Sequence, residues 1–378
     1  MTEETDQRRH LATRRRWVVK IGSSLLTADG QGVDRMRIGR WCADIAERVA
    51  AGDQVVLVSS GAVAEGCARL GFQSRPETVH ELQAVAAVGQ MGLIEAYEAS
   101  FQKHGRHTAL VLLTHDDLAN RERYLNARAT LRTLLSLGVV PVVNENDSVA
   151  TEEIKFGDND TLAALVTNLV EADVLVLLTD RAGLHATDPG VDANAPLVSF
   201  AHASDARLDG MAGKVAGRLG RGGMITKIGA ARLAARSGAS TVIADGREPA
   251  VFGRVRAGDN VGTLLVADVE PLVARKRWIA GQLRTRGELT LDAGAVRVLR
   301  SQGRSLLPVG VTASRGQYAR GDVVLCLDPD GNAVAKGLVN YSSAETERIL
   351  GCTSVEISER LGYVEEPELV HRDNLVIL

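Results

Sequence analysis

Two lysines beside glycine-rich turns are the side chains of this sequence best suited to act on phosphate. Lys20 lies near the end of an apolar run, residues 17–21, and is followed by Gly22 and two serines. Lys227 closes a second cluster, which opens an expected helix over residues 225–237. Bare backbone N–H groups at such turns, and the positive end of a helix dipole, favour anions. The spacing differs from that of a Walker A loop.

A group of carboxylates accompanies these lysines. Asp158, Asn159 and Asp160 precede an expected helix that starts at Thr161. Asp160 is placed as an N-cap of that helix, or the two carboxylates bind an amino group and hold the lysines. Two lysines with a carboxylate fit phosphoryl transfer, where positioning and charge neutralisation dominate. No nucleophile–base pair stands out, and a carboxylate acceptor, with a pKa of about 4.3, needs none.

Apolar runs alternate with helical patterns through the first two thirds of the chain. Strands are predicted at residues 17–21, 54–58, 108–113, 139–143 and 174–178, and helices at 34–51, 81–103, 124–137 and 161–169. This alternation indicates an α/β fold with a parallel sheet covered on both faces. Ligands bind at the carboxyl edge of such sheets. We therefore expect one crevice lined by Lys20, Gly22, Ser60, Gly61, residues 144–147, Thr179 and Asp180.

The pattern changes near residue 269. Short strands are predicted at 288–291, 296–299, 305–307, 323–327 and 333–336, which is typical of a small β-barrel. The predicted division is a basic flexible tail (1–15), an α/β domain (16–269), a linker (270–286), a barrel (287–363) and a C-terminal tail (364–378).

Composition excludes several classes of protein. The formal net charge of −3 gives no reason to expect nucleic acid or an anionic membrane as a partner. The four cysteines form no C-x-x-C pair, which disfavours disulfides and structural zinc and suits the cytoplasm. No apolar stretch approaches the length of a membrane span.

The chemical motifs, taken in order, resemble those of the amino acid kinase family, in its branch that phosphorylates glutamate. They lie at residues 17–25, 57–62, 144–149, 156–160, 179–189 and 222–227. Residues 287–362 resemble a PUA domain. The resemblance implies a three-layer amino acid kinase fold with a mainly parallel central sheet, plus a small C-terminal β-barrel that is PUA-like.

The same resemblance implies a function. It is ATP-dependent phosphorylation of the side-chain carboxylate of L-glutamate, the first step of proline synthesis. Mg²⁺ would arrive with ATP rather than on a protein site, and proline would inhibit. The product would pass to a reductase that accepts glutamyl phosphate, and the enzyme would be a homo-oligomer, a dimer or tetramer, in the cytoplasm.

Site residues follow from the resemblance, position by position. Lys20 and Lys227 would stabilise the transferring phosphoryl group and Asp160 would orient them. Glutamate would be held by Ser60, Gly61, Asp147, Asp158 and Asn159. ATP would contact Lys20, Gly22, Thr179, Asp180, Arg221, Gly222, Gly223, Met224, Ile225, Thr226 and Lys227. Arg221 and His185 depart from the family pattern, which often has threonine and tyrosine there.

Other functions remain open from the sequence. A related kinase could use acetylglutamate, aspartate or carbamate as acceptor. An RNA-binding protein is a second class, because PUA modules elsewhere bind RNA. Residues 284–363 carry ten basic and nine acidic side chains, a net charge of +1, which is far from a basic footprint. A catalytically dead amino acid sensor would require a disabled phosphate site, yet both lysines are present.

Overall fold

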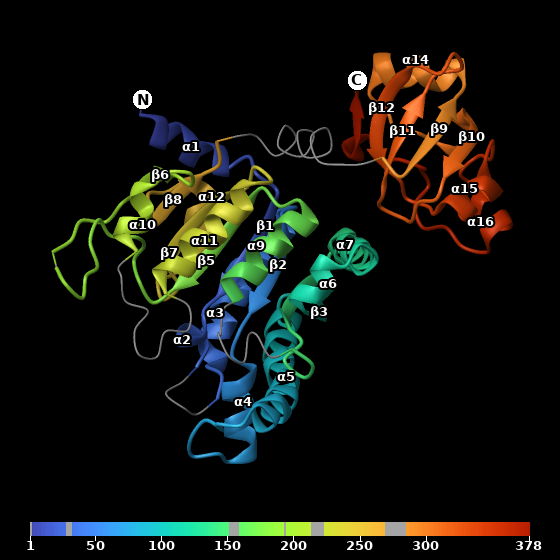
Figure 1. The fold of residues 1–378 in the computed structure, drawn as a ribbon. Coiled ribbons are helices and arrows are strands. Elements are labelled where there is room, and N and C mark those ends of the chain that lie inside the picture. The colour runs from blue at the N-terminus through green and yellow to red at the C-terminus, as the bar shows by residue number, and fades with distance from the viewer. Residues whose placement is uncertain (1, 28–31, 151–158, 193, 213–222, 269–284) are drawn as a thin grey trace. The chain divides into compact units, whose positions relative to one another are not determined.

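The computed structural model describes residues 2–27, 32–150, 159–192, 194–212, 223–268 and 285–378 (Figure 1). Contacts divide the chain into two compact units, Met1–Glu270 and Pro271–Leu378. Most of the predicted linker, residues 270–284, lies outside the described residues.

The first unit is built on an eight-stranded sheet with the order β3-β4-β2-β1-β5-β7-β8-β6. Every neighbouring pair is parallel except β7 and β8. The five strands predicted from the sequence are confirmed, whereas β6, β7 and β8 were not predicted. The bounds are β1 Arg16–Ile21, β2 Gln54–Ser59, β3 Thr108–Leu113, β4 Val140–Glu145, β5 Val174–Thr179, β6 Phe200–His202, β7 Ser240–Asp245 and β8 Thr263–Val266.

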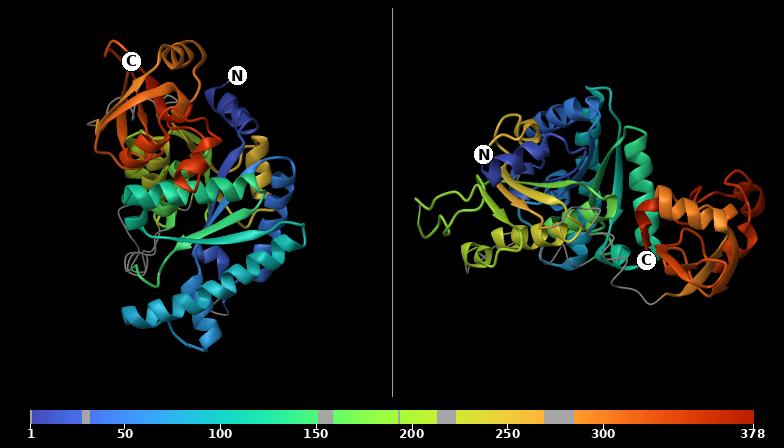
Figure 2. Two further views of the ribbon diagram at one scale, coloured as in Figure 1. Left: turned by 90° about the vertical axis from the view of Figure 1, so that its right-hand side faces the viewer. Right: turned by 90° about the horizontal axis from the view of Figure 1, so that it is seen from above.

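Helices cover both faces of this sheet, as Figures 1 and 2 show. Alternate strand residues point to opposite faces, so Val18 and Val19 of β1 enter different apolar clusters. One cluster includes α3 (Arg35–Ala50), α5 (Val79–Gln102) and α12 (Val251–Ala257). The other includes α7 (Arg121–Ser136), α9 (Asn159–Val170) and α11 (Met224–Ala235). The three-layer α/β prediction is confirmed.

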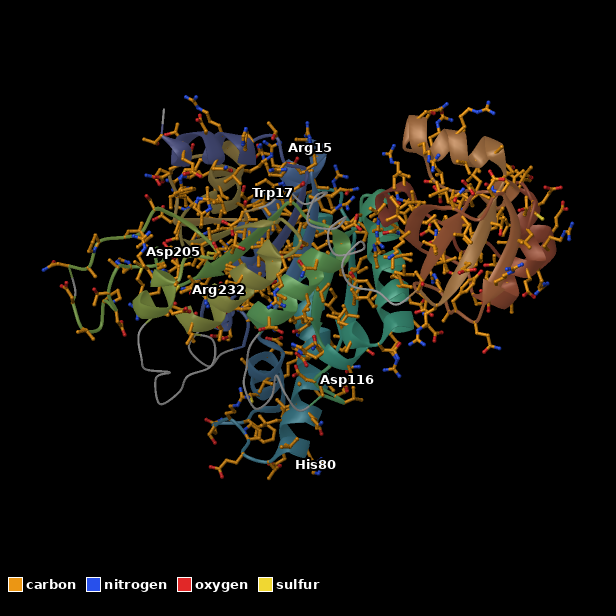
Figure 3. The ribbon with its side chains drawn as sticks, turned by 45° about the horizontal axis from the view of Figure 1, so that its top comes forward. Arg15, Trp17, His80, Asp116, Asp205 and Arg232 are labelled. Atoms are coloured by element: carbon orange, nitrogen blue, oxygen red, sulfur yellow. The ribbon has the colours of Figure 1, made fainter. Side chains whose placement is uncertain are left out.

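Trp17 of β1 anchors the first of these clusters (Figure 3). Its side chain is fully buried, and its ring meets that of Phe252 edge-on, with centroids 5.4 Å apart. An edge-to-face aromatic pair adds about 1 kcal/mol to the burial of its area. The pair joins the central strand to α12 and so fixes the outer helix on the sheet that carries the site.

Two glycines bring α4 (Ala62–Leu70) against α5. A Cβ added at Gly66 would lie 1.8 Å from the carbonyl oxygen of Val85, and one added at Gly89 would lie 1.7 Å from that of Ala62. The two helix backbones therefore touch, and no larger residue fits at either position.

The basic N-terminus is an ordered part of the first unit, so the prediction of a flexible tail is wrong. Residues Glu3–Leu11 form helix α1, whose Leu11 enters the apolar core. The Arg8 side chain is buried and donates to the carbonyl oxygens of Ser199 (2.8 Å), Asp259 (3.1 Å), Val261 (3.2 Å) and Gly262 (3.2 Å). These partners are far away in sequence, which is why charge counting along the tail could not reveal them.

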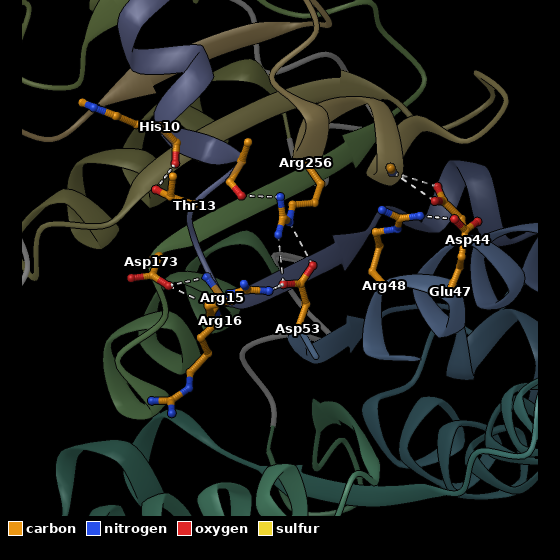
Figure 4. Close-up of polar contacts among 12 residues, drawn as sticks. His10, Thr13, Arg15, Arg16, Asp44, Glu47, Arg48, Asp53, Asp173 and Arg256 are labelled. Atoms are coloured by element: carbon orange, nitrogen blue, oxygen red, sulfur yellow. Dashed lines mark hydrogen bonds and ion pairs between the residues drawn. The ribbon is translucent and has the colours of Figure 1, made fainter. Parts of the chain in front are cut away.

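Further contacts near this segment involve two carboxylates, the buried Asp53 and the half-buried Asp173 (Figure 4). The buried Asp53 accepts from Arg256 Nε at 2.9 Å and from Arg15 Nη1 at 3.4 Å. Asp173 accepts the backbone N–H groups of Arg15 and Arg16, both at 3.0 Å. These contacts hold the chain at the entry to β1, although the side chains of Arg9 and Arg15 stay exposed.

The second unit holds a five-stranded sheet with the order β10-β9-β11-β12-β13. Its strands are β9 Gly287–Leu291, β10 Val311–Gly316, β11 Val323–Leu327, β12 Ala333–Leu338 and β13 Leu375–Ile377. Three helices accompany them, α14 Ala293–Gln302, α15 Ser343–Ile349 and α16 Glu356–Leu361. One buried cluster, which includes Leu289, Cys326 and Tyr341, forms the core.

Three predictions for the second unit are wrong. Residues 296–299 belong to α14, because Asp292 accepts the N–H of Ala295 at 2.7 Å and starts a helix there. Residues 305–307 contribute one isolated bridge, Leu306 to Val370, rather than a strand. The expected C-terminal tail contains β13, which pairs with β12.

The anchoring of α1 yields a first prediction. Arg8→Ala should lower the free energy of unfolding of the first unit by roughly 3 kcal/mol, because it removes several hydrogen bonds from a charged donor and leaves buried carbonyls unpaired. Urea denaturation followed by tryptophan fluorescence measures this, since Trp17 and Trp41 lie in that core. Arg9→Ala, at an exposed position of the same helix, is the matched control. Equal effects of the two variants would contradict the anchoring role.

Candidate active site

One carboxylate joins two lysines at the carboxyl edge of the sheet. Lys20 Nζ lies 2.6 Å from Asp160 Oδ1, and Lys227 Nζ lies 3.1 Å from Asp160 Oδ2. Thr226 Oγ1 donates to the same Oδ2 at 2.8 Å. The Asp160 side chain is fully buried and each lysine side chain is 7% exposed. The structure thus brings together three residues that are separated by more than 200 positions of sequence.

The strand register and the positions of two helix starts explain why Lys20, Asp160 and Lys227 come together. Lys20 pairs in register with Val58 of β2 and Leu177 of β5, and all three point to the face covered by α9 and α11. Asp160 lies in the first turn of α9 and Lys227 in the first turn of α11. Asp160 is a helix residue whose carboxylate turns to the lysines. Of the two alternatives left open by the sequence, the N-cap is therefore wrong, and the contact with the lysines is present.

Charge dominates the ionisation of Asp160. Burial alone would raise the pKa of this carboxyl, but the two adjacent ammonium groups outweigh burial and hold its pKa well below the usual range. Asp160 is therefore ionised at neutral pH. The charged carboxylate holds both lysine side chains in place through the two ion pairs.

A network of amides and hydroxyls lies at the end of β2 and β4. The buried Asn159 donates from Nδ2 to Ser60 Oγ (2.9 Å), to the Ser59 carbonyl oxygen (3.0 Å) and to Asn144 Oδ1 (3.2 Å). Gly61 follows with φ of 98°, a left-handed conformation that favours glycine, and α4 starts directly after it. The predicted residues Ser60, Gly61 and Asn159 therefore lie together.

Two buried carboxylates stand beside this network. Asp147 is 4% exposed, and its Oδ1 has no hydrogen-bond partner among the described residues. Burial, and next the negative charge of Glu145, raise the pKa of Asp147 to about 7, against a smaller opposite effect of Arg75. Glu145 is 1% exposed, and its Oε2 likewise lacks a partner within the described part of the chain.

The residues expected to contact nucleotide lie on the β1, β5 and α11 side. The Gly22 N–H donates to the carbonyl oxygen of Leu178 at 3.1 Å, which sets Gly22 beside Thr179 at the end of β5. Thr179 Oγ1 donates to Asp180 Oδ1 at 3.2 Å. Gly223 precedes α11, where Met224 is half-buried and Ile225 exposed. Asp158, Arg221 and Gly222 lie outside the described residues.

Comparisons with known proteins decide the family. The model of the amino acid kinase family matches residues 15–245, and that of the PUA domain matches residues 287–361. The chain belongs to the amino acid kinase family. Two relatives, both named glutamate 5-kinase, are 62% identical to it: one from Thioalkalivibrio sulfidiphilus and one from Nitrosococcus oceani, each covering 99% of this chain and all of the relative. A third relative of that name, from Methylococcus capsulatus, is 59% identical over 98% of this chain.

Membership of the amino acid kinase family agrees with the fold and with the phosphotransferase chemistry expected from the sequence. His185, which departs from the family pattern, donates from Nδ1 to the carbonyl oxygen of Ala195 at 2.7 Å. No described helix combines the length and apolar character needed to cross a bilayer. Within the same residues, no group of three or more His, Cys, Asp or Glu side chains could hold a metal ion.

Sequence reasoning missed three polar residues of the site. Gln90 of α5 is buried and bonds both Asn144 Nδ2 (3.1 Å) and the carbonyl oxygen of Glu145 (3.3 Å). Glu145 was named only as part of its loop, and His115, whose Nδ1 lies 3.7 Å from Glu145 Oε1, was not named. A polar residue on the buried face of an Ala-rich helix is the signal that could have revealed Gln90.

The raised pKa of Asp147 makes stability depend on pH. The carboxyl titrates near 3.8 when unfolded and at about 7 when folded, so only the folded state binds its proton between these values. Stability therefore falls as pH rises through this window, by up to about 4 kcal/mol. Asp147→Asn should raise the melting temperature by several degrees at about pH 8 and change it little at about pH 4.5.

Thermal unfolding at the two pH values measures this effect. Asp116→Asn is the matched control, because Asp116 is an exposed carboxylate of helix α6 (His115–Ala119) (Figure 3). The control should show no gain that depends on pH. A melting temperature of Asp147→Asn that is lowered equally at both pH values would contradict the buried charge.

Proposed function

We propose that this protein transfers the γ-phosphoryl group of ATP to the side-chain carboxylate of L-glutamate. The observation that carries the proposal is the pair of buried lysines held by one carboxylate, Lys20 and Lys227 on Asp160. Relatives with 62% identity across the whole chain are named glutamate 5-kinase, which supports the choice of acceptor.

The lysines act by placing positive charge where negative charge gathers during transfer. An ammonium group carries three N–H donors, so a lysine paired with Asp160 can also donate to phosphate oxygens. Because both groups are already positioned, they stabilise the transferring phosphoryl group without reorganisation at the moment of reaction. Asp160 touches both lysines and fixes their separation. Gly22, Thr179, Asp180 and residues 221–227 would contact the nucleotide.

The acceptor side suits an ammonium group. Asp147 Oδ1 and Asn159 Oδ1 are buried acceptors without partners among the described residues. An α-ammonium supplies three donors and a positive charge, so it would satisfy both oxygens and offset the negative charge of Asp147. Ser60, Gly61 and Asp158 complete this proposed glutamate site. An acceptor carboxylate is ionised at neutral pH and attacks without a general base.

Mg²⁺ would be held by the phosphates of ATP and would neutralise part of their charge. Family resemblance supports the remaining proposals: inhibition by proline, transfer of the labile acyl phosphate to a reductase, assembly into a dimer or tetramer and a cytoplasmic location. The chemistry would reside in residues 16–269, with the PUA-like domain as a separate module after the linker and no nucleic acid required.

The deciding experiment is ADP release from Mg-ATP with and without L-glutamate. We expect turnover that depends on L-glutamate, with acetylglutamate and aspartate as weak or inactive acceptors. Turnover that is highest with another acceptor would replace glutamate in the proposal, and no dependence on any acceptor would contradict a kinase of this class.

The two lysines should contribute mainly to the transition state. Lys20→Ala and Lys227→Ala should each lower kcat by about 10²–10³, with a much smaller rise in the KM for glutamate. Steady-state kinetics of the folded variants measures this. A variant that keeps a near-normal kcat would exclude its lysine from the stabilising role. Arg9→Ala, on the exposed side of α1, controls for the loss of one positive charge.

Asp147 should act on the acceptor alone. Asp147→Asn should raise the KM for glutamate at least tenfold and leave that for ATP nearly unchanged, because it removes the negative charge opposite the α-ammonium. Initial rates with each substrate varied in turn measure both constants, and Asp116→Asn is again the control. A rise of both constants by the same factor would point to a folding defect.

A further inference from the structure

Glu145 is a buried charge that the proposed chemistry does not use. Its backbone is held on both sides: its N–H donates to Asn144 Oδ1 at 2.9 Å, and its carbonyl oxygen accepts from Gln90 Nε2 at 3.3 Å. Its side chain is 1% exposed, and Oε2 has no hydrogen-bond partner in the described part of the chain. A buried carboxylate with an oxygen left unpaired is costly to keep, so its position calls for a function.

The register places Glu145 on the catalytic face of the sheet. Lys20 of β1 is level with Val58 of β2, and Val58 is level with Val143 of β4. Glu145 lies two residues beyond Val143 and therefore points to the same face, nearer the carboxyl edge. Two strand spacings, about 10 Å, separate β4 from β1. Glu145 thus lies on the same side of the sheet as Lys20, two strands away from it and two residues before Asp147.

The charges around Asp147 are unevenly balanced. Glu145 adds a negative charge two residues away, and the positive charge of Arg75, in the loop between α4 and α5, has a smaller opposite effect. His115 at the start of α6 lies 3.7 Å from Glu145 and compensates it only when protonated. The acceptor side therefore holds two buried carboxylates, one more negative charge than an α-ammonium contact alone requires.

We propose that Glu145 makes the acceptor site selective for molecules that carry a protonated amine, by adding a second buried negative charge beside Asp147. This inference rests on the proposed function and deepens it. A cationic amine is attracted by both carboxylates, whereas an acceptor without an amine meets two buried charges that repel its own carboxylates. Glu145 is thus a specificity-determining residue that acts through the field at Asp147 and needs no contact with the acceptor.

The test compares L-glutamate with glutarate, which has the same carbon chain and both carboxylates but no amine. The measured quantity is the ratio of kcat/KM for the two acceptors. Glu145→Gln should lower this ratio at least about tenfold, since it keeps the shape and removes the charge. Asp116→Asn, a nearby exposed carboxylate, should leave the ratio unchanged, and Glu145→Asp should keep it close to that of the wild type.

The pH dependence of kcat/KM distinguishes an electrostatic role of Glu145 from a purely structural one, because loss of a structural contact alone would not shift the acidic limb. Removing the charge of Glu145 lowers the pKa of Asp147, so the acidic limb of kcat/KM for glutamate should shift to lower pH in Glu145→Gln by about one unit. Where His115 is protonated it offsets the charge of Glu145, so His115→Gln should shift the same limb to higher pH. This second variant decides the matter if Glu145→Gln fails to fold.

The outcomes separate the two proposals. An unchanged ratio together with an unmoved acidic limb in Glu145→Gln, in a wild type that uses glutamate, would overturn the role of Glu145 alone. An equal loss with both acceptors would also overturn it, because the role would then be structural. A wild type that releases no ADP with L-glutamate would overturn the proposed function, and the inference with it.

Discussion

The ion pairs between Asp160 and the two lysines, Lys20 and Lys227, impose the strongest constraint on this fold. Taking three charged groups out of water costs several kcal/mol for each ion. Only short, well-oriented ion pairs and hydrogen bonds between these groups can offset that cost. Here β1, α9 and α11 each contribute one member, so the relative positions of three elements are fixed by a single carboxylate. A shift of α11 would leave a buried ammonium without its partner, which is far more costly than a loosened apolar contact.

Two carboxylates at one edge of the sheet, Asp160 and Asp147, have opposite electrostatic surroundings. Asp160 has two cations beside it, which hold its pKa below the usual range, while Asp147 has a second carboxylate nearby and a pKa raised to about 7. The first arrangement leaves net positive charge for a phosphate, and the second leaves net negative charge for an ammonium. The edge therefore prefers a molecule, or a pair of molecules, whose anionic end lies near β1 and whose cationic end lies near β4. Opposed environments of this kind commonly mark the assignments in an active site.

Local sequence patterns predicted the parts of the fold that local physics determines. Continuous Val and Leu runs made the five strands β1–β5 readable, and the carboxyl edge rule then placed Lys20, Ser60, Asn144 and Thr179 together. The same reasoning failed where the structure of a segment depends on contacts with residues far away in the sequence. From the sequence alone, Arg8 looks like a solvated charge of a tail. In the structure its side chain donates to the carbonyl oxygens of Ser199 (2.8 Å) and Gly262 (3.2 Å). Residues 296–299 alternate like a strand, yet the cap at Asp292 makes them helical. Glu145 was missed because it stands out only through the burial of its side chain, and no pattern of residue types shows that burial.

Stability and binding are in conflict on the acceptor side of the site. Asp147 and Glu145 would be less costly as amides or apolar residues, since each bears a buried oxygen without a partner in the described structure. The surrounding fold holds the backbone of Glu145 in place through the side-chain amides of Gln90 and Asn144, which also bond each other. A cationic group that enters this site removes an unfavourable interaction as well as adding a favourable one. Its binding is therefore stronger than the new contacts alone would give, and an uncharged competitor gains none of that relief.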